Sequence, residues 1–301
     1  MSINNQKLQS MLYGAFYGDA YSLGGHWVYD TTEIENASFD LSDCNNPISS
    51  YHPTKSKGDF THYGDQMFWL LQDLVKEDKF SLVDFGQRWH TNMQIYTGYI
   101  DGASKHTVKK LSEDKNYFAC GSGSSDLSAV SRMFPIILKY NDSLLDMQEA
   151  IKLHTILTHM SKDLVLSGAF FSEVSVAVLN GADLEKTLLE SSKHFGDNIS
   201  QWTQKAQEAL ELNPKEAIHK LGASCSVNGA FASTIYILLK YKDNFFEALQ
   251  ENMLAGGESS ARGMIIGGIL GIVHAKELLS SPCMQQMNHY KEIKELISNI
   301  L

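Results

Sequence analysis

The chain has 301 residues, of which 43% are hydrophobic and 20% charged, and this composition is typical of a globular protein rather than a disordered one. Its formal net charge of −10 argues against binding to nucleic acid, which depends on basic groups that contact phosphates. A small anionic substrate is not excluded, because one arginine or one helix N-terminus can hold a phosphate in an acidic protein.

The cysteines and the N-terminal segment indicate the compartment. The cysteines are far apart and form no C-x-x-C pair, which favours reduced thiols over a disulfide framework or a zinc site. The N-terminus lacks the basic segment followed by an apolar segment that marks a secretion signal. We therefore expect a cytoplasmic protein that does not bind membranes. The cysteines are Cys44, Cys120, Cys225 and Cys283.

Apolar residues recur mostly at intervals of three to four, which predicts helices along most of the chain. The first is expected over residues 7–20, followed by a turn at residues 24–27. Residues 31–57 show no sustained period, and so long an irregular segment inside a compact domain suggests a functional loop. Helices are then predicted over residues 66–76, 85–96 and 106–111, and a flexible turn over residues 120–126.

The second half of the chain continues the same pattern. Residues 127–138 are expected to form an apolar helix that carries Arg132 and Pro135. Successive helices are predicted over residues 148–159, 164–180, 184–194, 229–241, 245–254 and 291–301. No repeat, low-complexity segment or shift in composition divides the chain. We therefore predict a single all-α domain over residues 1–301.

The apolar run at residues 254–275 is expected to be the central buried helix. Gly263, Gly267 and Gly271 recur at every fourth position, although each glycine costs roughly 0.5–1 kcal/mol relative to alanine in a helix. A face without side chains offsets this cost if another helix or a ligand approaches the backbone. The polar N-terminus of the run, residues 257–262, suits an anion. An ordinary capped core helix is the alternative interpretation.

Three polar clusters lie at predicted helix ends, where backbone N–H groups are free. The second cluster contains Asp59, His62 and Asp65, which could form an acid–base or metal-binding patch. Alternatively, Asp59 or Asp65 caps the helix that begins near residue 66, and His62 is a structural loop histidine. The first cluster is Gly18, Asp19 and His26, the second is residues 58–66, and the third is residues 256–262.

Four short segments resemble, in order and spacing, the motifs of the ADP-ribosylglycohydrolase family. Residues 14–20, GAFYGDA, resemble its opening G-A-x-x-G-D-A motif, and residues 126–135 resemble its segment that ends in R-x-x-P. Thr158-His159 resembles its T-H motif. Residues 256–261, GGESSA, lie where the family has G-G-D-T-D-T. The resemblance implies a compact all-α helical bundle with a cleft built from these loops, and two magnesium ions beside the ribose of ADP-ribose.

The departures from these motifs concern the expected metal ligands. The family motif Y-T-D-D-T corresponds to residues 61–65, so Tyr63 and Gly64 replace its paired aspartates. Glu258 replaces the first aspartate of the last motif, and Ser260 replaces the second. Mg²⁺ requires oxygen ligands in nearly octahedral geometry, and the surviving candidates are too few for two ions. We therefore predict one weakly bound metal or none, with Asp65, Glu258, Ser260 and, less directly, Asp59 as candidate ligands.

Hydrolysis of an ADP-ribosyl bond requires a carboxylate that activates water and an acid that protonates the leaving group. The predicted base is Asp65 or Glu258, and the predicted acid is His62 or His26. Arg262 and the backbone of residues 257–260 are expected to hold a phosphate. A structural ion pair for Arg262, a capping turn at Ser125-Asp126 and a satisfied buried His159 remain alternatives. The predicted substrate-binding residues are Asp19, Ser125, Asp126, His159, Gly257, Ser259 and Arg262.

The sequence thus predicts a hydrolase of an ADP-ribosyl or related ribosyl glycosidic bond, with little or no dependence on magnesium. The expected substrate is a small molecule or an ADP-ribosylated protein; no pattern indicates the oligomeric state. Another glycoside or nucleoside conjugate is a further candidate, because one fold supports several substrates. The alternative is a non-catalytic ligand-binding or structural member, comparable to the jellyfish lens crystallins that resemble this family. The polarity of the three clusters favours retained chemistry or ligand binding.

Overall fold

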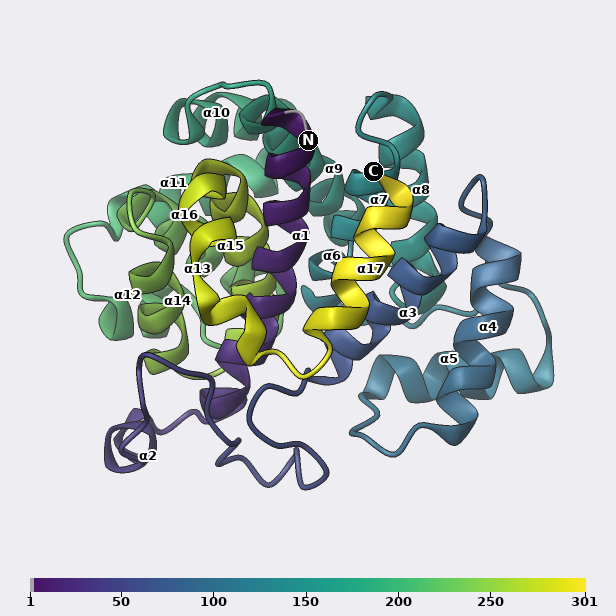
Figure 1. The fold of residues 1–301 in the computed structure, drawn as a ribbon, viewed down its shortest axis with the longest axis horizontal. Helices are drawn as coiled ribbons and strands as arrows, with labels where there is room; N and C mark the ends of the chain where they lie inside the picture. Colours follow the sequence, from purple (N-terminus) through teal and green to yellow (C-terminus); the bar gives the residue numbers. More distant parts are fainter. Residues whose placement is uncertain (1–2) are drawn as a thin grey trace.

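Two glycine-bearing helices, α1 (Ile3–Ser22) and α15 (Ser259–Val273), lie in contact through the middle of the molecule (Figure 1). The computed structural model describes residues 3–301. A Cβ on Gly14 would clash with the carbonyl oxygen of Gly267, and a Cβ on Gly18 would clash with that of Gly263. The prediction that the glycine face permits close approach is confirmed, and the partner is the first helix of the chain.

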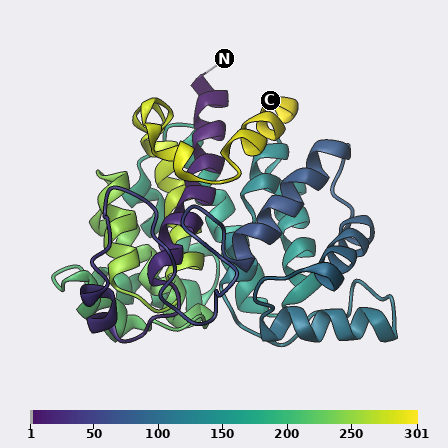
Figure 2. The same cartoon turned by 60° about the horizontal axis from the view of Figure 1, so that its bottom comes forward.

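Further helices surround this central pair, and the predicted all-α helical bundle is confirmed. Figures 1 and 2 show α11–α14 on one side of the pair and α3–α5 on the other. The longer helices are α3 (His62–Lys76), α4 (Leu82–Ile95), α5 (Gly102–Glu113), α8 (Leu144–Thr158), α9 (Lys162–Leu179), α11 (Asp197–Glu208), α13 (Val227–Lys240), α14 (Phe245–Leu254) and α17 (Tyr290–Ile300). The shorter ones are α2 (Thr31–Asn36), α6 (Ser128–Ser131), α7 (Phe134–Lys139), α10 (Leu184–Ser191), α12 (Pro214–Leu221) and α16 (Ala275–Ser280), with 3₁₀ turns at Leu23–Gly25, Ser192–His194 and Pro282–Gln286.

Three predicted elements differ from the structure. The segment 31–57 is not irregular throughout, because it begins with α2, which is capped by the side chain of Asp30. The helix expected over residues 127–138 is two short helices, α6 and α7, and Pro135 lies in the first turn of α7, where its missing N–H costs nothing. The run at residues 254–275 is helical from Ser259, and a separate helix, α16, follows it.

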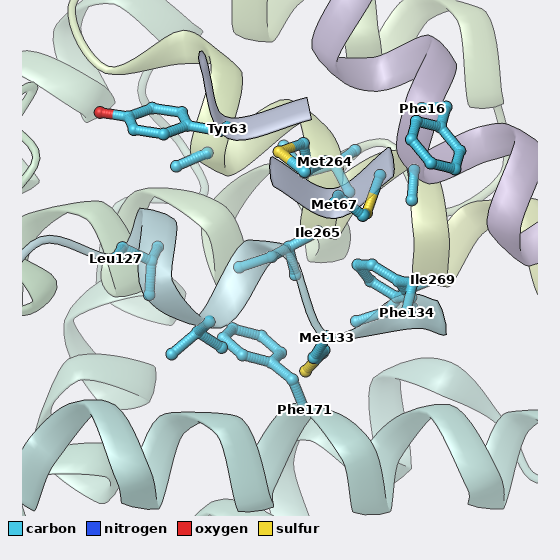
Figure 3. Close-up of a cluster of buried hydrophobic side chains, with 14 of the residues drawn as sticks. Phe16, Tyr63, Met67, Leu127, Met133, Phe134, Phe171, Met264, Ile265 and Ile269 are labelled. Atoms are coloured by element: carbon cyan, nitrogen blue, oxygen red, sulfur yellow. The ribbon is translucent and has the colours of Figure 1, made fainter. Parts of the chain in front are cut away.

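The buried core joins side chains from α1, α3, α7, α9 and α15 (Figure 3). Phe16, Met67, Phe134 and Ile265 lie among its labelled members. Tyr63 lies at the edge of this cluster, and its hydroxyl points away from the apolar side chains. The polar site begins at this hydroxyl.

The loop at residues 120–126 is fixed by two isolated β-bridges, the only β-pairing in residues 3–301. Ser122 pairs with His159, and Asp126 pairs with Ser226. These bridges bring the loop against the end of α8 and the start of α13, which lie far from it in the sequence. In the described part of the chain, no helix is both long enough and apolar enough to cross a membrane.

Candidate functional site

Glu258 is the N-cap of α15 and is completely buried. Gly256 and Gly257 precede it with φ angles of +66° and +62°, a left-handed conformation that glycine adopts without strain. Its Oε1 accepts a hydrogen bond from the Ala261 N–H at 3.3 Å. Its Oε2 accepts from the Trp27 indole N–H at 2.7 Å and from the Tyr63 hydroxyl at 3.2 Å. Every one of these donors is uncharged.

Asp126 is the second carboxyl group of the site. Its Oδ1 accepts from the Ser128 N–H at 2.9 Å, and its Oδ2 lies 3.4 Å from the Tyr63 hydroxyl. One ligand atom each from Asp126, Cys225 and Glu258 lie within 4.8 Å of one another. We refer to the two carboxyl groups as the Asp126–Glu258 pair.

Burial raises the pKa of both carboxyl groups in the Asp126–Glu258 pair. Burial, and then the charge of Asp126, raise the pKa of Glu258 to about 8. Burial also raises the pKa of Asp126, to about 6, with a further contribution from Asp101. Two close carboxyl groups titrate as a unit, and this pair holds one proton near pH 7. Such a pair can both donate and accept a proton at that pH.

An aromatic cap lies beside Glu258; it consists of Trp27, Tyr51, His52, His62 and Tyr99. The ring centroid of Trp27 lies 4.9 Å from that of Tyr99 and 5.2 Å from that of Tyr51, both in edge-on contacts. Trp27 has a φ of +59°, which is a strained conformation for a bulky residue. A cavity of about 460 Å³ lies on the outer side of the cap, against Tyr51, Tyr99 and Lys105.

His26 and His62, the predicted acids, are buried beside Trp27. His26 Nδ1 accepts from the Ser260 N–H at 3.3 Å, which places the ring hydrogen on Nε2. His62 Nε2 lies 3.7 Å from Asp101 Oδ2. Burial lowers the pKa of His26 well below its ordinary value, and burial lowers that of His62 to about 3. Both rings are therefore neutral near pH 7, and the carboxyl pair is the better proton donor.

Two further predicted carboxylates, Asp65 and Asp19, are held by other partners. Asp65 bonds to Lys55 and to the hydroxyl of Tyr96. Asp19 accepts both the N–H of Thr61, at 2.8 Å, and its hydroxyl, at 2.6 Å. These two hydrogen bonds therefore link α1 to the start of α3 through the Asp19 side chain. It does not place Asp65 in the trio of Asp126, Cys225 and Glu258.

The predicted phosphate-binding groups already have partners. The backbone N–H of Gly257 donates to Val28, that of Ser259 to Gly257, and that of Ser260 to His26. Arg262 is completely buried and donates to the Asn252 side chain and to the Gly256 carbonyl. A phosphate at this helix end would have to displace these bonds, although the buried Nη1 of Arg262 has no hydrogen-bond partner within residues 3–301.

The remaining predicted residues surround the Asp126 loop. Ser125 Oγ lies 3.2 Å from Ser226 Oγ, and His159 Nδ1 lies 2.8 Å from Thr158 Oγ1. His159 Nε2 and Ser260 Oγ are buried and have no hydrogen-bond partner within residues 3–301. These atoms are available to a polar ligand.

Sequence reasoning did not assign a role to three residues of this site: Trp27, Tyr63 and Cys225. An isolated tryptophan or cysteine between apolar helices carries no local signal of function, because such residues are usually part of the core. Tyr63 was identifiable only as the replacement of an expected aspartate. Its position next to two carboxyl groups arises from contacts between distant segments.

The residues present do not fit two magnesium ions. The Asp126–Glu258 pair offers two carboxyl groups, and the third nearby ligand is a thiol, which Mg²⁺ does not favour. The Tyr63 hydroxyl lies between the two carboxyl groups. An aspartate at Gly64 would clash with the present position of Asp19, because even a Cβ there is too close to the Asp19 carboxylate. The ligand atoms of the trio are close enough together for one metal ion of another type, but the Tyr63 hydroxyl would have to move from between the carboxyl groups.

Comparisons with known proteins agree on one family. The family model described as ADP-ribosylglycohydrolase matches residues 2–301. Crystallin J1B of Tripedalia cystophora is 21% identical to this chain, and the match covers 98% of this chain and 96% of the crystallin. Crystallin J1A of the same organism is 20% identical, and the match covers 95% of this chain and 94% of the crystallin. A solved structure titled "ADP-ribosylglycohydrolase-related protein complex" superposes with a TM-score of 0.78 over 99% of this chain and 97% of that one, at 15% identity.

Proposed function

The chain belongs to the ADP-ribosylglycohydrolase family, and from this membership we propose that it hydrolyses the glycosidic bond of an ADP-ribosyl or related ribosyl group without requiring magnesium. Family membership supports a glycohydrolase type of reaction. The observation that carries the proposal is the close Asp126–Glu258 pair, which holds one proton near pH 7 beside neutral hydrogen-bond donors.

The two carboxyl groups take different roles in the proposed reaction. Glu258, with the higher pKa, donates its proton to the leaving group as the bond to the anomeric carbon breaks. Asp126 is ionised more readily, stabilises the developing positive charge on the ribose and accepts a proton from the attacking water. The water oxygen becomes the new anomeric hydroxyl, and the proton left on Asp126 restores the shared proton of the pair.

Substrate entry requires movement of the aromatic cap. Glu258 and Tyr63 are at most 1% exposed, so Glu258 is closed off from solvent in this conformation, whereas Asp126 is partly exposed. In our proposal, Trp27 moves away from Glu258, and the group attached to the ribosyl unit occupies the outer cavity beside Tyr51 and Tyr99. The strained backbone of Trp27 favours such a movement, because a change of conformation relieves the strain.

A release assay tests this proposal. EDTA-treated protein is incubated with N-linked and O-linked ADP-ribosyl conjugates, and free ADP-ribose is measured by chromatography. We expect release that survives EDTA and falls at least about 100-fold in Glu258→Gln and Asp126→Asn, as for loss of a general acid or base. Equal release by folded variants and wild type would contradict the assigned roles.

A non-catalytic role is the second candidate, and two observations favour it. The curated relatives at 20–21% identity are named crystallins, and Glu258 is completely buried. This candidate predicts no release of ADP-ribose from any conjugate. It also predicts that Glu258→Gln changes stability alone.

A further inference from the structure

The hydroxyl of Tyr63 lies between the two carboxyl groups of the Asp126–Glu258 pair. It is 3.4 Å from Asp126 Oδ2 and 3.2 Å from Glu258 Oε2. The ring is fixed by its contacts: its centroid lies 4.0 Å from that of His62 and 5.7 Å from that of His26. Figure 3 shows the ring at the edge of the apolar core, with the oxygen directed out of it. The hydroxyl therefore has a defined position.

Two carboxyl groups at this separation, one of them completely buried, require either a positive charge or a proton between them. The phenol has one hydrogen and can donate to only one of the two groups. The other contact is satisfied when the second carboxyl group carries a proton and donates it to the phenol oxygen. The phenol and one proton thus relieve the repulsion between the two carboxyl groups, which a cation would otherwise relieve.

The outer sides of the pair are also satisfied by neutral donors. Glu258 accepts from Trp27 and from the Ala261 N–H, and Asp126 accepts from the Ser128 N–H and the Cys225 thiol. The nearby guanidinium of Arg262 donates to Asn252 and Gly256 instead. A cation that entered the pair would have to displace the Tyr63 hydroxyl.

We infer that Tyr63 occupies the position of a divalent cation between Asp126 and Glu258, so that this site in the native protein excludes such cations. Replacement of Tyr63 by a small residue then uncovers a site for one thiophilic cation, with Asp126, Cys225 and Glu258 as ligands. Two carboxylate oxygens and a thiolate suit ions of the zinc class better than Mg²⁺. The inference concerns cation binding and holds whether or not the protein hydrolyses a glycoside.

Cobalt(II) is a suitable probe, because a bound thiolate gives it a charge-transfer absorption band that reports ligation by cysteine. EDTA-treated, reduced wild type, Tyr63→Ala and the double variant Tyr63→Ala/Cys225→Ser are titrated with Co²⁺ alone. We expect no thiolate band in wild type, a band that saturates at one equivalent in Tyr63→Ala, and no band in the double variant. The double variant is the matched control for the other three cysteines.

Two outcomes overturn the inference. One is a stoichiometric thiolate band in wild type that disappears in Cys225→Ser, because Tyr63 then does not exclude the cation. The other is a folded Tyr63→Ala protein, checked by circular dichroism and a thermal melt, that binds no Co²⁺. If Tyr63→Ala does not fold, Tyr63→Asp replaces it, since its carboxylate adds a ligand from the same backbone position and is expected to bind Co²⁺ through the same thiolate.

Discussion

The indole N–H of Trp27 donates to Glu258 at 2.7 Å, although 231 positions separate the two residues in the sequence. This bond joins the turn after α1 to the cap of α15. The backbone makes the same connection, because the Trp27 N–H donates to Gly257 and the Gly257 N–H donates to Val28. The buried carboxyl group of Glu258 is thus held by the segment that also covers it.

Trp27→Phe tests this connection. The substitution keeps an aromatic ring in the cap but removes the donor to a buried carboxyl group, which costs about 1–3 kcal/mol. We expect the free energy of unfolding, measured in urea, to fall by this amount. Trp69→Phe is the control, because Trp69 lies beside Tyr96, outside the cap. Equal losses in the two variants would show that ring packing, and not the bond to Glu258, accounts for the effect.

Gly18→Ala tests the contact between α1 and α15. A Cβ at residue 18 meets the carbonyl group of Gly263, which belongs to backbone and cannot rotate away. We expect a loss of about 2–4 kcal/mol in the free energy of unfolding, despite the higher helix propensity of alanine. Gly102→Ala is the matched control in α5, because nothing lies within 4 Å of its Cβ. A neutral Gly18→Ala variant would contradict the close approach of the two helices.

Glu258→Gln should change how stability depends on pH. The pKa of Glu258 is raised by burial from 4.5 to about 8, so folding retains a proton that the unfolded chain releases between these values. The stability that neutral Glu258 contributes is complete below pH 4.5 and is lost as the pH rises through about 8. Glutamine stays neutral throughout. The variant should therefore gain stability relative to wild type across this interval, by at least about 1 kcal/mol.

Urea unfolding at pH 5, 6, 7 and 8 measures this difference. Glu211→Gln is the control, because Glu211 is exposed and its substitution should give a constant difference. A Glu258→Gln difference that also stays constant across these pH values would mean that Glu258 is ionised in the folded protein at pH 5.

The sequence predicted those features that depend on local spacing. The glycines at residues 263, 267 and 271 were recognisable as a contact face, and the order of four motifs identified the family fold. Some helices begin earlier than predicted. The helix expected from residue 66, α3, begins at His62, because the Thr61 side chain accepts the N–H of Tyr63 and caps it. The break between α6 and α7 was missed, because apolar residues continue across it.

The arrangement of the site was much less predictable. Glu258 was identified from its motif, but Asp126 was assigned only to substrate binding, because its pairing with Glu258 depends on bridges between segments far apart in sequence. The polar N-terminus of α15 was expected to be free for a phosphate. In the structure the Glu258 side chain caps the helix locally, in agreement with the alternative of a capped core helix, and His26 accepts the Ser260 N–H; nothing in the local pattern indicates this second, distant partner.

Calorimetric titration with ADP-ribose tests the central claim, a ribosyl site that works through the Asp126–Glu258 pair without magnesium. EDTA-treated protein is titrated in the presence and absence of Mg²⁺, with Glu258→Gln as the variant that alters the pair. We expect binding to wild type with the same affinity under both conditions, and weaker binding to the variant. Binding that appears only with Mg²⁺, or no binding in either condition, would contradict the account.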